Sequence, residues 1–263
     1  MDLQLAASRV FISGSTQGIG FAIARAFLRE GAEVVVNGRD ERRVEESVQR
    51  LGREVTGAVV SGIAADLADA SETGRLIGAI GDVDVLVNNA GLFEVAPFAD
   101  ITDADWSRFF DVNVMSGVRL SRALLPRMID AGRGRVLFVG SESGVNVPGD
   151  MTHYGVTKAA VLALGNGLAK LTRGTGVTVN TILGGPTYSD GVADAVRHLA
   201  SANGLPEEQM RAAIIAANRT SLLERFIEPE EIASLAVYLA SPLASATNGA
   251  AIRADGGVLT AML

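Results

Sequence analysis

The segment Val10-Phe11-Ile12-Ser13-Gly14-Ser15-Thr16-Gln17-Gly18-Ile19-Gly20 joins an apolar run to a helical pattern that continues to Leu28. This order predicts a buried strand, a glycine-rich turn and a helix. Gly14 and Gly18 let the backbone turn tightly and approach a ligand, and Gly20 lets the helix pack against the strand. The helix N-terminus offers free N–H groups to a pyrophosphate. The segment therefore predicts a dinucleotide site, although such turns also occur for steric reasons alone.

The rest of the chain repeats the alternation of strand and helix. Six further apolar runs are predicted as strands, at residues 33–37, 58–63, 83–87, 135–139, 177–183 and 250–254. Helical patterns lie between them, at residues 40–51, 70–80, 103–127, 158–171 and 229–239. The alternation predicts one α/β domain over residues 1–263, a doubly wound parallel sheet in a three-layer α/β/α arrangement.

Residues 188–226 break this alternation, with two short helices expected around 192–199 and 207–217. An insertion at the ligand-binding edge of the sheet predicts a lid over the substrate.

Composition excludes several classes of function. The 263 residues are 48% hydrophobic, enough for a large core, and the net charge of −7 disfavours binding to nucleic acid or an anionic membrane. There is no cysteine, and the two histidines, His153 and His198, lack a metal-ligand pattern, so we expect no metal site. No run reaches the ~18 apolar residues of a membrane span, and the N-terminus does not resemble a signal peptide. A soluble cytoplasmic protein is expected.

Polar and small residues follow several of the predicted strands. Asp66, beside Leu67, sits just past a strand end, where it can accept a hydrogen bond from an adenine amino group or, as an equal alternative, cap a helix. The segment Asn88-Asn89-Ala90-Gly91 follows the next strand. Its amides can tie adjacent strand ends together, and Ala90 and Gly91 leave space for a flat ring or a ribose.

Arg39 decides the predicted cofactor. An acidic side chain at the end of the second strand would hold the adenosine ribose hydroxyls, whereas an arginine suits a 2′-phosphate. Here Gly38 leaves room and Arg39 supplies positive charge, which favours NADP over NAD. Asp40 keeps NAD possible, and Arg39 has the alternative of simply starting a charged helix.

Tyr154 and Lys158 are four residues apart in a helical pattern, so they share one face about 6 Å apart along the axis. A phenol has an ordinary pKa near ~10, and a nearby ammonium lowers it, which would allow proton transfer near neutrality. Any helix carries such pairs by chance. Ser141 favours a catalytic role for this pair over a chance pairing, because it follows a predicted strand thirteen residues before Tyr154, at the same sheet edge as the glycine turn.

Asn113 interrupts the apolar face of the helical pattern at 103–127. A buried asparagine needs partners, and it can distort the helix and hold a water. A hydrolase nucleophile at Ser141 is disfavoured, because no G-x-S-x-G elbow surrounds it.

The ordered set of these motifs resembles a classical short-chain dehydrogenase/reductase over essentially the whole chain. The resemblance implies a Rossmann-type fold and a homotetramer. It also implies that Tyr154 is the acid-base residue, Ser141 steadies the substrate oxygen, Lys158 lowers the tyrosine pKa and binds the nicotinamide ribose, and Asn113 holds a relay water.

Two positions depart from the family pattern. Ser13 stands where threonine is usual, and Gly184-Gly185 stands where Pro-Gly is usual, which bears on the cofactor contacts implied for Gly185 and Thr187. The predicted cofactor-binding residues are Gly14, Ser15, Thr16, Gln17, Gly18, Ile19, Gly20, Arg39, Asp66, Leu67, Asn89, Ala90, Gly91, Tyr154, Lys158, Gly185 and Thr187.

The leading functional hypothesis is an NADP-dependent oxidoreductase acting on a secondary alcohol or its ketone. The Tyr154–Lys158 spacing disfavours the enoyl-reductase branch of the family, in which these two residues lie further apart. A non-catalytic redox sensor and an epimerase or dehydratase on the same fold are the alternatives. The apolar tail 258–263 could pack at a subunit interface.

Overall fold

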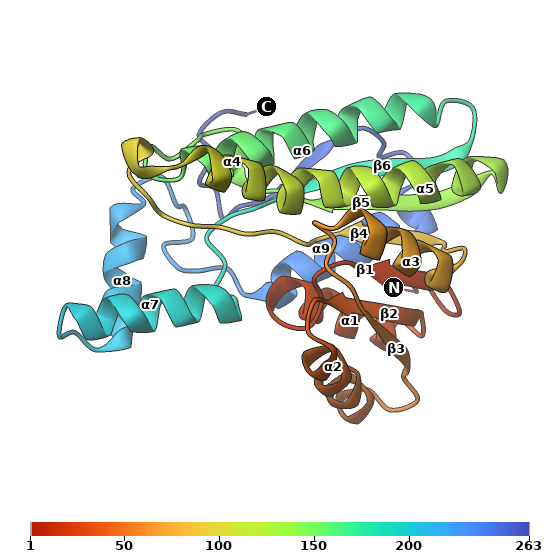
Figure 1. Cartoon of the computed structure of the whole chain (residues 1–263), viewed down its shortest axis with the longest axis horizontal. Coiled ribbons are helices and arrows are strands. Elements are labelled where there is room, and N and C mark those ends of the chain that lie inside the picture. Colours follow the sequence, from red (N-terminus) through yellow and green to blue (C-terminus); the bar gives the residue numbers. More distant parts are fainter. Residues whose placement is uncertain (1, 263) are drawn as a thin grey trace.

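The predicted strands form one parallel sheet in the computed structural model, which describes residues 2–262 (Figure 1). The strands are β1 Arg9–Ile12, β2 Glu33–Gly38, β3 Val59–Ala64, β4 Val85–Asn88, β5 Arg133–Val139, β6 Gly176–Gly184 and β7 Ala251–Ala254. Their order is β3-β2-β1-β4-β5-β6-β7, and every neighbouring pair is parallel. The strand order reverses between β1 and β4, so the crevice outside their carboxyl ends is where such a sheet binds ligands.

Helices cover both faces of the sheet and bury an apolar core on each. One layer contains α1 Gly18–Arg29, α2 Glu41–Glu54 and α9 Pro229–Ala240. The other contains α3 Ala70–Ile80, α5 Ser116–Asp130 and α6 Thr152–Leu171. Short elements complete the chain, namely α4 Asp103–Phe110 and the 3-10 helices η1 Phe98–Asp100, η3 Glu142–Gly144 and η4 Pro242–Ala244. The predicted doubly wound, three-layer fold is confirmed.

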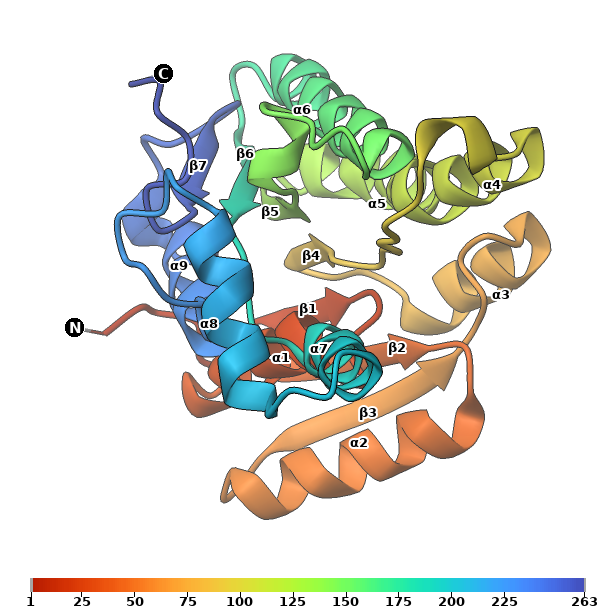
Figure 2. The ribbon, with the colours of Figure 1, turned by 90° about the vertical axis from the view of Figure 1, so that its left-hand side faces the viewer.

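Two helices lie outside the three layers, as the break in alternation predicts. They are α7 Asp190–Ala202 and α8 Glu207–Ala217. Figures 1 and 2 show them beside the sheet, next to the start of α1. They therefore stand at the edge where the crevice opens.

The long helix predicted over 103–127 is interrupted at Asn113. Residues Asp111–Met115 form a π-helical turn, η2, between α4 and α5. The Asn113 amide donates to the Leu92 carbonyl at 3.0 Å and to Thr157 Oγ1 at 2.9 Å. The buried amide thus finds its partners outside its own helix, and the distortion predicted there is present.

Candidate active site

The glycine-rich turn forms the floor of the crevice. Gly14 and Gly18 have φ angles of 60° and 59°, in the left-handed region that favours glycine. A Cβ on Gly14 would lie 2.9 Å from the Ala90 Cα, so the close approach of β1 and β4 requires glycine there. The Asn89 amide donates to the carbonyls of Ser13 and Gly14 at 3.0 and 2.8 Å. It ties the two strand ends together as predicted.

A cavity of about 860 Å³ opens above this turn. Its lining includes these predicted cofactor residues: Gly14, Thr16, Gln17, Gly18, Ile19, Gly20, Arg39, Asp66, Leu67, Asn89, Ala90 and Gly91. Gln17, the N-cap of α1, makes no side-chain hydrogen bond to the helix, so apart from the Gly18 N–H, which donates to Asp190, the cap leaves the first-turn N–H groups to other partners. The cradle is therefore suited to an anionic, elongated ligand such as a dinucleotide.

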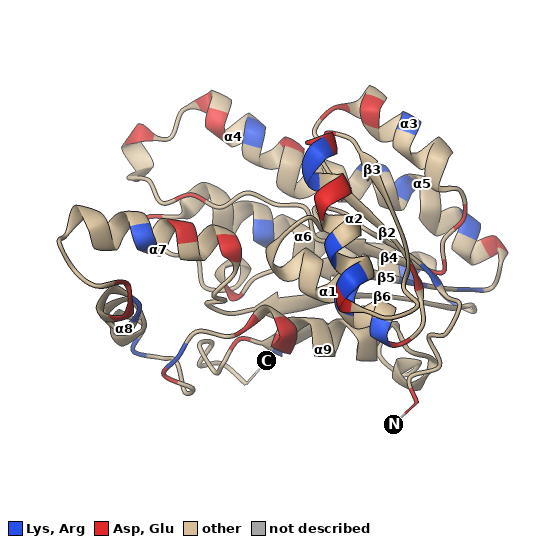
Figure 3. Cartoon of the chain, turned by 90° about the horizontal axis from the view of Figure 1, so that it is seen from below, with Lys and Arg blue, Asp and Glu red and all other residues tan. Residues whose placement is uncertain are grey.

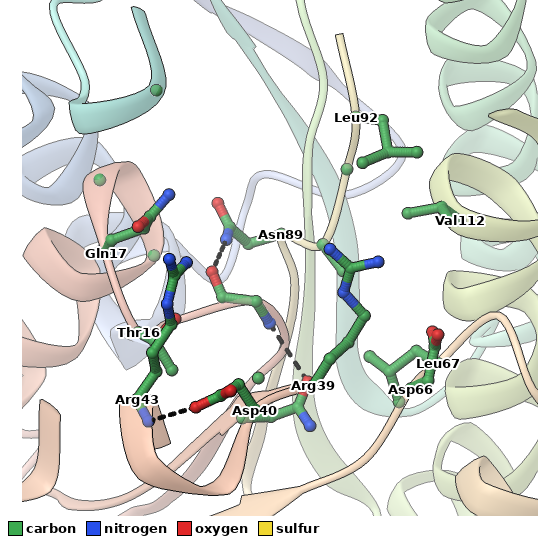
Figure 4. A pocket seen from close by; sticks show the side chains of 18 of the residues that line it. Thr16, Gln17, Arg39, Asp40, Arg43, Asp66, Leu67, Asn89, Leu92 and Val112 are labelled. Atoms are coloured by element: carbon green, nitrogen blue, oxygen red, sulfur yellow. Dashed lines mark hydrogen bonds between the residues drawn. The ribbon is translucent and has the colours of Figure 1, made fainter. Parts of the chain in front are cut away.

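The end of the cavity at β2 is basic. Figure 4 shows the Arg39 side chain extending into the cavity, with Thr16 and Arg43 on one side and Asp66 and Leu67 on the other. Within residues 2–262, neither Arg39 nor Arg43 forms a salt bridge. A Cβ on Gly38 would lie 2.6 Å from Thr16 Cγ2, so this position has no room for a side chain.

Two aspartates near this end have local tasks. Asp40 is the N-cap of α2 and accepts the backbone N–H of Arg43 at 2.8 Å. The N-cap of α3 is Asp69, not Asp66. Asp66 accepts the Ala68 N–H at 3.0 Å and lines the cavity, so of the two roles considered for it, helix capping is wrong.

The predicted catalytic side chains come from three elements. Ser141 follows β5, Asn113 lies in η2, and Tyr154 and Lys158 lie one turn apart on α6, which starts earlier than predicted, at Thr152. Lys158 Nζ donates to the Val139 carbonyl at 2.9 Å and lies 5.6 Å from the centroid of the Tyr154 ring. A Cβ placed on Gly91 would be 3.6 Å from this Nζ, so the ammonium borders the cavity lining.

Burial sets the acidity of this pair. Tyr154 keeps part of its surface accessible, but burial raises the pKa of its hydroxyl to about 12, against a lowering by its hydrogen bond with Ser141. Burial lowers the pKa of Lys158 to about 8. Sequence spacing predicts that Lys158 lowers the tyrosine pKa. The net direction is the opposite, because loss of solvent disfavours the charged form of both groups.

Some predicted residues lie outside the cavity. Ser15 is buried and donates to the Ile12 carbonyl at 2.7 Å. Thr187 Oγ1 donates to the Gly185 carbonyl at 2.9 Å, and a Cβ on Gly185 would lie 2.4 Å from the Asp255 carbonyl oxygen. The Gly185 backbone N–H donates to the Ala254 carbonyl at 3.2 Å, which joins the end of β6 to the end of β7.

Sequence reasoning missed three residues at this edge. Arg43 lines the cavity, and its spacing of four from Arg39 is the signal that could have found it. Asp190 accepts the Gly18 N–H at 2.6 Å, and this contact could not be predicted because it joins segments that are far apart in the sequence. Glu142 accepts the Ser141 hydroxyl, and its place in a predicted turn gave no signal of this contact.

The histidines have no part in this arrangement. His153 is buried, with its ring 4.0 Å from that of Phe109 and 6.2 Å from that of Trp106. Over residues 2–262, no three His, Asp or Glu side chains come together in a way that could hold a metal ion. The same residues include no helix that is long and apolar enough to cross a membrane.

Known proteins are similar to this chain in sequence and fold. A family model described as enoyl-(acyl carrier protein) reductase matches residues 14–259. The chain is 45% identical to the uncharacterized oxidoreductase YvrD of Bacillus subtilis, covering 100% of both proteins. It is 31% identical to a D-beta-hydroxybutyrate dehydrogenase of Cupriavidus necator, covering 94% of this chain and 95% of that protein.

A similar solved structure is that of L-sorbose reductase from Gluconobacter frateurii, complexed with NADPH and L-sorbose. The TM-score is 0.94 at 30% identity, and each chain is covered to 100%. One edge of the sheet carries four features together: the glycine turn, the Asn89 hydrogen bonds to it, the π-helical turn at Asn113 and the helix with Tyr154 and Lys158. The chain belongs to the short-chain dehydrogenase/reductase family.

Proposed function

We propose that this protein is an NADP-dependent oxidoreductase that interconverts a secondary alcohol and its ketone. The observation that carries the proposal is the pairing of a basic dinucleotide cradle with a phenol and an ammonium one helical turn apart. D-beta-hydroxybutyrate dehydrogenase and L-sorbose reductase, which this chain resembles, are named for such reactions. Bound NADPH would supply the hydride that reaches the carbonyl carbon.

The residues of this chain would transfer the proton that accompanies the hydride. Tyr154 donates its phenolic proton to the carbonyl oxygen in reduction and takes it back in oxidation. Ser141 hydrogen-bonds the same oxygen and orients it toward Tyr154. Lys158 holds the cofactor ribose beside Gly91 and replaces part of the solvation that the phenolate loses on burial.

The cofactor would lie along the cavity. The first turn of α1 holds the pyrophosphate, with Asn89, Ala90 and Gly91 toward the nicotinamide ribose and Arg39 on the 2′-phosphate. Asp66 accepts from the adenine amino group. Charged residues of both signs alternate along α2 (Figure 3), so the basic character is local to the cavity rather than a face for nucleic acid.

Tyr154→Phe tests the proposal. It keeps the ring and removes the hydroxyl that donates the proton, so turnover of any ketone found active should fall by about 10²-fold or more while NADPH still binds. Turnover would be followed by NADPH absorbance, and binding by cofactor fluorescence. Tyr238→Phe, on α9, is the matched control and should leave both unchanged. Unchanged turnover in Tyr154→Phe would refute the proposed role.

The alternatives predict other results from the same assay. A redox sensor binds NADPH but turns over no member of a broad carbonyl panel. An epimerase or dehydratase forms product without a net change in nicotinamide absorbance. The panel should include an α,β-unsaturated thioester, because the matched family model is described as an enoyl reductase. Turnover of that thioester alone would replace the alcohol/ketone assignment.

We also propose that residues 188–226 form the substrate lid of a single catalytic domain, that the enzyme works in the cytoplasm, and that it assembles as a homotetramer. The lid proposal is supported by the position of α7 and α8 beside the cavity, which Ser189 and Gly191 help to line. The tetramer proposal is supported by an exposed apolar face on α5 and α6. The predicted interface tail includes Leu263, which lies outside the described residues.

A further inference from the structure

Arg119, near the start of α5, contacts the segment 66–68, which lines the cavity on the side that Figure 4 shows with Asp66, Leu67 and Val112. Its Nη1 donates to the Leu67 carbonyl at 3.0 Å, and its Nη2 donates to the Asp111 carboxylate of η2 at 3.4 Å. The Arg119 side chain is 16% exposed, so these bonds are largely shielded from water. One guanidinium therefore joins the segment after β3 to the start of η2.

The segment 66–68 leaves one donor and one acceptor unused. The Asp66 N–H donates to Glu72 Oε2 at 2.7 Å, and the Ala68 N–H donates to Asp66 Oδ1 at 3.0 Å. Within residues 2–262, the Leu67 N–H donates to no protein group. This N–H and the second carboxylate oxygen of Asp66 complement an edge of adenine, which carries an amino donor beside a ring-nitrogen acceptor.

The Leu67 carbonyl depends on Arg119 for its hydrogen bond. Leu67 is buried, and a buried carbonyl needs a donor. Thr73 Oγ1 lies 3.3 Å from this carbonyl but 2.7 Å from the Asp69 carbonyl. Because a hydroxyl has a single proton, Thr73 is directed mainly at Asp69. Arg119 is therefore the main donor to Leu67.

The contact reaches the Asp66 carboxylate through one peptide plane. The Leu67 carbonyl and the Ala68 N–H belong to the same planar peptide and point in opposite directions. Arg119 holds the carbonyl end, and the N–H end donates to Asp66 Oδ1. Fixing the carbonyl thus also fixes the N–H that orients the carboxylate.

Arg119 is not required to hold Asn113, although both contact or belong to η2. The Asn113 amide is fixed by the Leu92 backbone and by Thr157 Oγ1. Loss of the Arg119 contact with Asp111 leaves these bonds in place. The effect of Arg119 is therefore directed at the cofactor segment rather than at the residues of the proton transfer.

We propose that Arg119 is a positioning residue for the adenine half of NADPH. It fixes the Leu67–Ala68 peptide, which in turn orients the Asp66 carboxylate that accepts from the adenine amino group. The inference rests on the proposed function, which places adenine beside Asp66, and it adds a residue that acts on the cofactor through its neighbours.

Deamino-NADPH, in which an oxo group replaces the adenine amino group, tests the inference. It has no amino donor for Asp66, so the parent should bind NADPH about tenfold more tightly, the effect of one hydrogen bond to a charged group. Arg119→Met keeps the length of the side chain and removes its donors. It should weaken NADPH by about tenfold but deamino-NADPH by about threefold or less, so the ratio of the two dissociation constants falls from about ten toward three. Fluorescence titration of the reduced nicotinamide measures both constants.

Two further variants separate positioning from general loss of structure. Arg119→Lys keeps one donor for the Leu67 carbonyl and should restore a ratio close to that of the parent. Arg127→Met is the matched control, because Arg127 lies on the same helix and also donates to a carbonyl, that of Gly81, and to a carboxylate, that of Asp82. It should leave both dissociation constants unchanged.

Turnover gives a second readout. At saturating NADPH, kcat of Arg119→Met should stay within about twofold of the parent while KM for NADPH rises, because the residues of the proton transfer keep their partners. A fall in kcat with unchanged KM would contradict the positioning role. Arg119→Gln, which is neutral and shorter, carries the same predictions and serves if the methionine variant does not fold.

The ratio of dissociation constants distinguishes the possible failures. If the parent binds both cofactors equally, adenine does not lie beside Asp66, and the proposed cofactor placement fails together with the inference. If the parent discriminates but Arg119→Met weakens both cofactors equally, the role of Arg119 is merely structural and only the inference is overturned. Unchanged affinities in Arg119→Met would overturn it as well.

Discussion

Arg39 and Arg43 bring two guanidinium groups to one end of the cavity, where Thr16 closes the wall. Guanidinium groups bind phosphate through paired hydrogen bonds, which lysine cannot reproduce. Asp40 and Asp66 also line this end of the cavity, but Asp40 accepts the Arg43 N–H at the start of α2 and Asp66 accepts the Ala68 N–H. The local charge thus favours a phosphate over bare ribose hydroxyls.

Arg39→Ala should therefore weaken NADPH much more than NADH. A charge-assisted pair to a phosphate accounts for about 2 kcal/mol, so we expect roughly a 30-fold loss for NADPH and less than about threefold for NADH. Fluorescence titration with both cofactors measures this. Arg53→Ala is the control, because Arg53 is an exposed arginine in the last turn of α2 that does not line the cavity. Equal effects on the two cofactors would refute the 2′-phosphate assignment.

Side-chain identities at the site could be predicted from sequence where the chemistry is local. Gly14, Asn89 and the Tyr154–Lys158 pair follow from spacing within a strand end or a helix turn, and the structure places them as expected. The acidity of Tyr154 could not be predicted, because burial depends on all the elements packed around it.

At the scale of elements, the start of α7 is fastened to the start of α1. The Asp190 carboxylate accepts the Gly18 N–H at 2.6 Å, across 172 residues of chain. Both residues lie in the first turns of their helices, where a negative charge is stabilised by the helix dipole. One carboxylate therefore anchors the proposed lid to the glycine turn.

Loss of this anchor should loosen α7. Asp190→Ala should increase hydrogen exchange of the α7 and α8 amides by about fivefold or more, since a charge-assisted bond contributes about 1–2 kcal/mol to local closure. Asp194→Ala, which removes an exposed carboxylate paired with Arg197 on the same helix, is the control and should leave exchange nearly unchanged. Equal protection in Asp190→Ala and the parent would contradict the anchoring role.

Element bounds were predictable where caps and patterns agree. The helices at Ala70–Ile80 and Glu207–Ala217 have the bounds predicted for them. The start of α6 at Thr152, two residues before Tyr154, could not be predicted, because Thr152 and His153 offer no apolar periodicity to mark it. The division of the 103–127 pattern into α4, η2 and α5 depends on Leu92 and Thr157, partners that only the folded chain brings to Asn113.

At the scale of the whole molecule, α5 and α6 present an apolar groove of about 410 Å³ on the outer face of their layer. Its apolar lining residues are Val118, Leu125, Pro126, Ile129, Leu164, Leu168 and Leu171. Leu171 is 63% exposed. Apolar surface of this kind, rimmed by Arg122 and Asp130, is typical of a subunit interface, and its self-complementary charges suit a twofold axis.

Sedimentation velocity tests whether a second copy covers this groove. The parent, with a chain mass of 27.3 kDa, should sediment as a tetramer. Leu171→Arg places a charge in the middle of a contact that occurs on both sides of a twofold axis, so each interface would bury two unpaired charges. Because a closed tetramer uses more than one kind of interface, the variant should give dimers rather than monomers.

Leu199→Arg on α7, at an exposed leucine outside the groove, should leave the tetramer intact. A parent that sediments only as a monomer would refute the proposed assembly, and a tetramer that persists in Leu171→Arg would move the interface to another face.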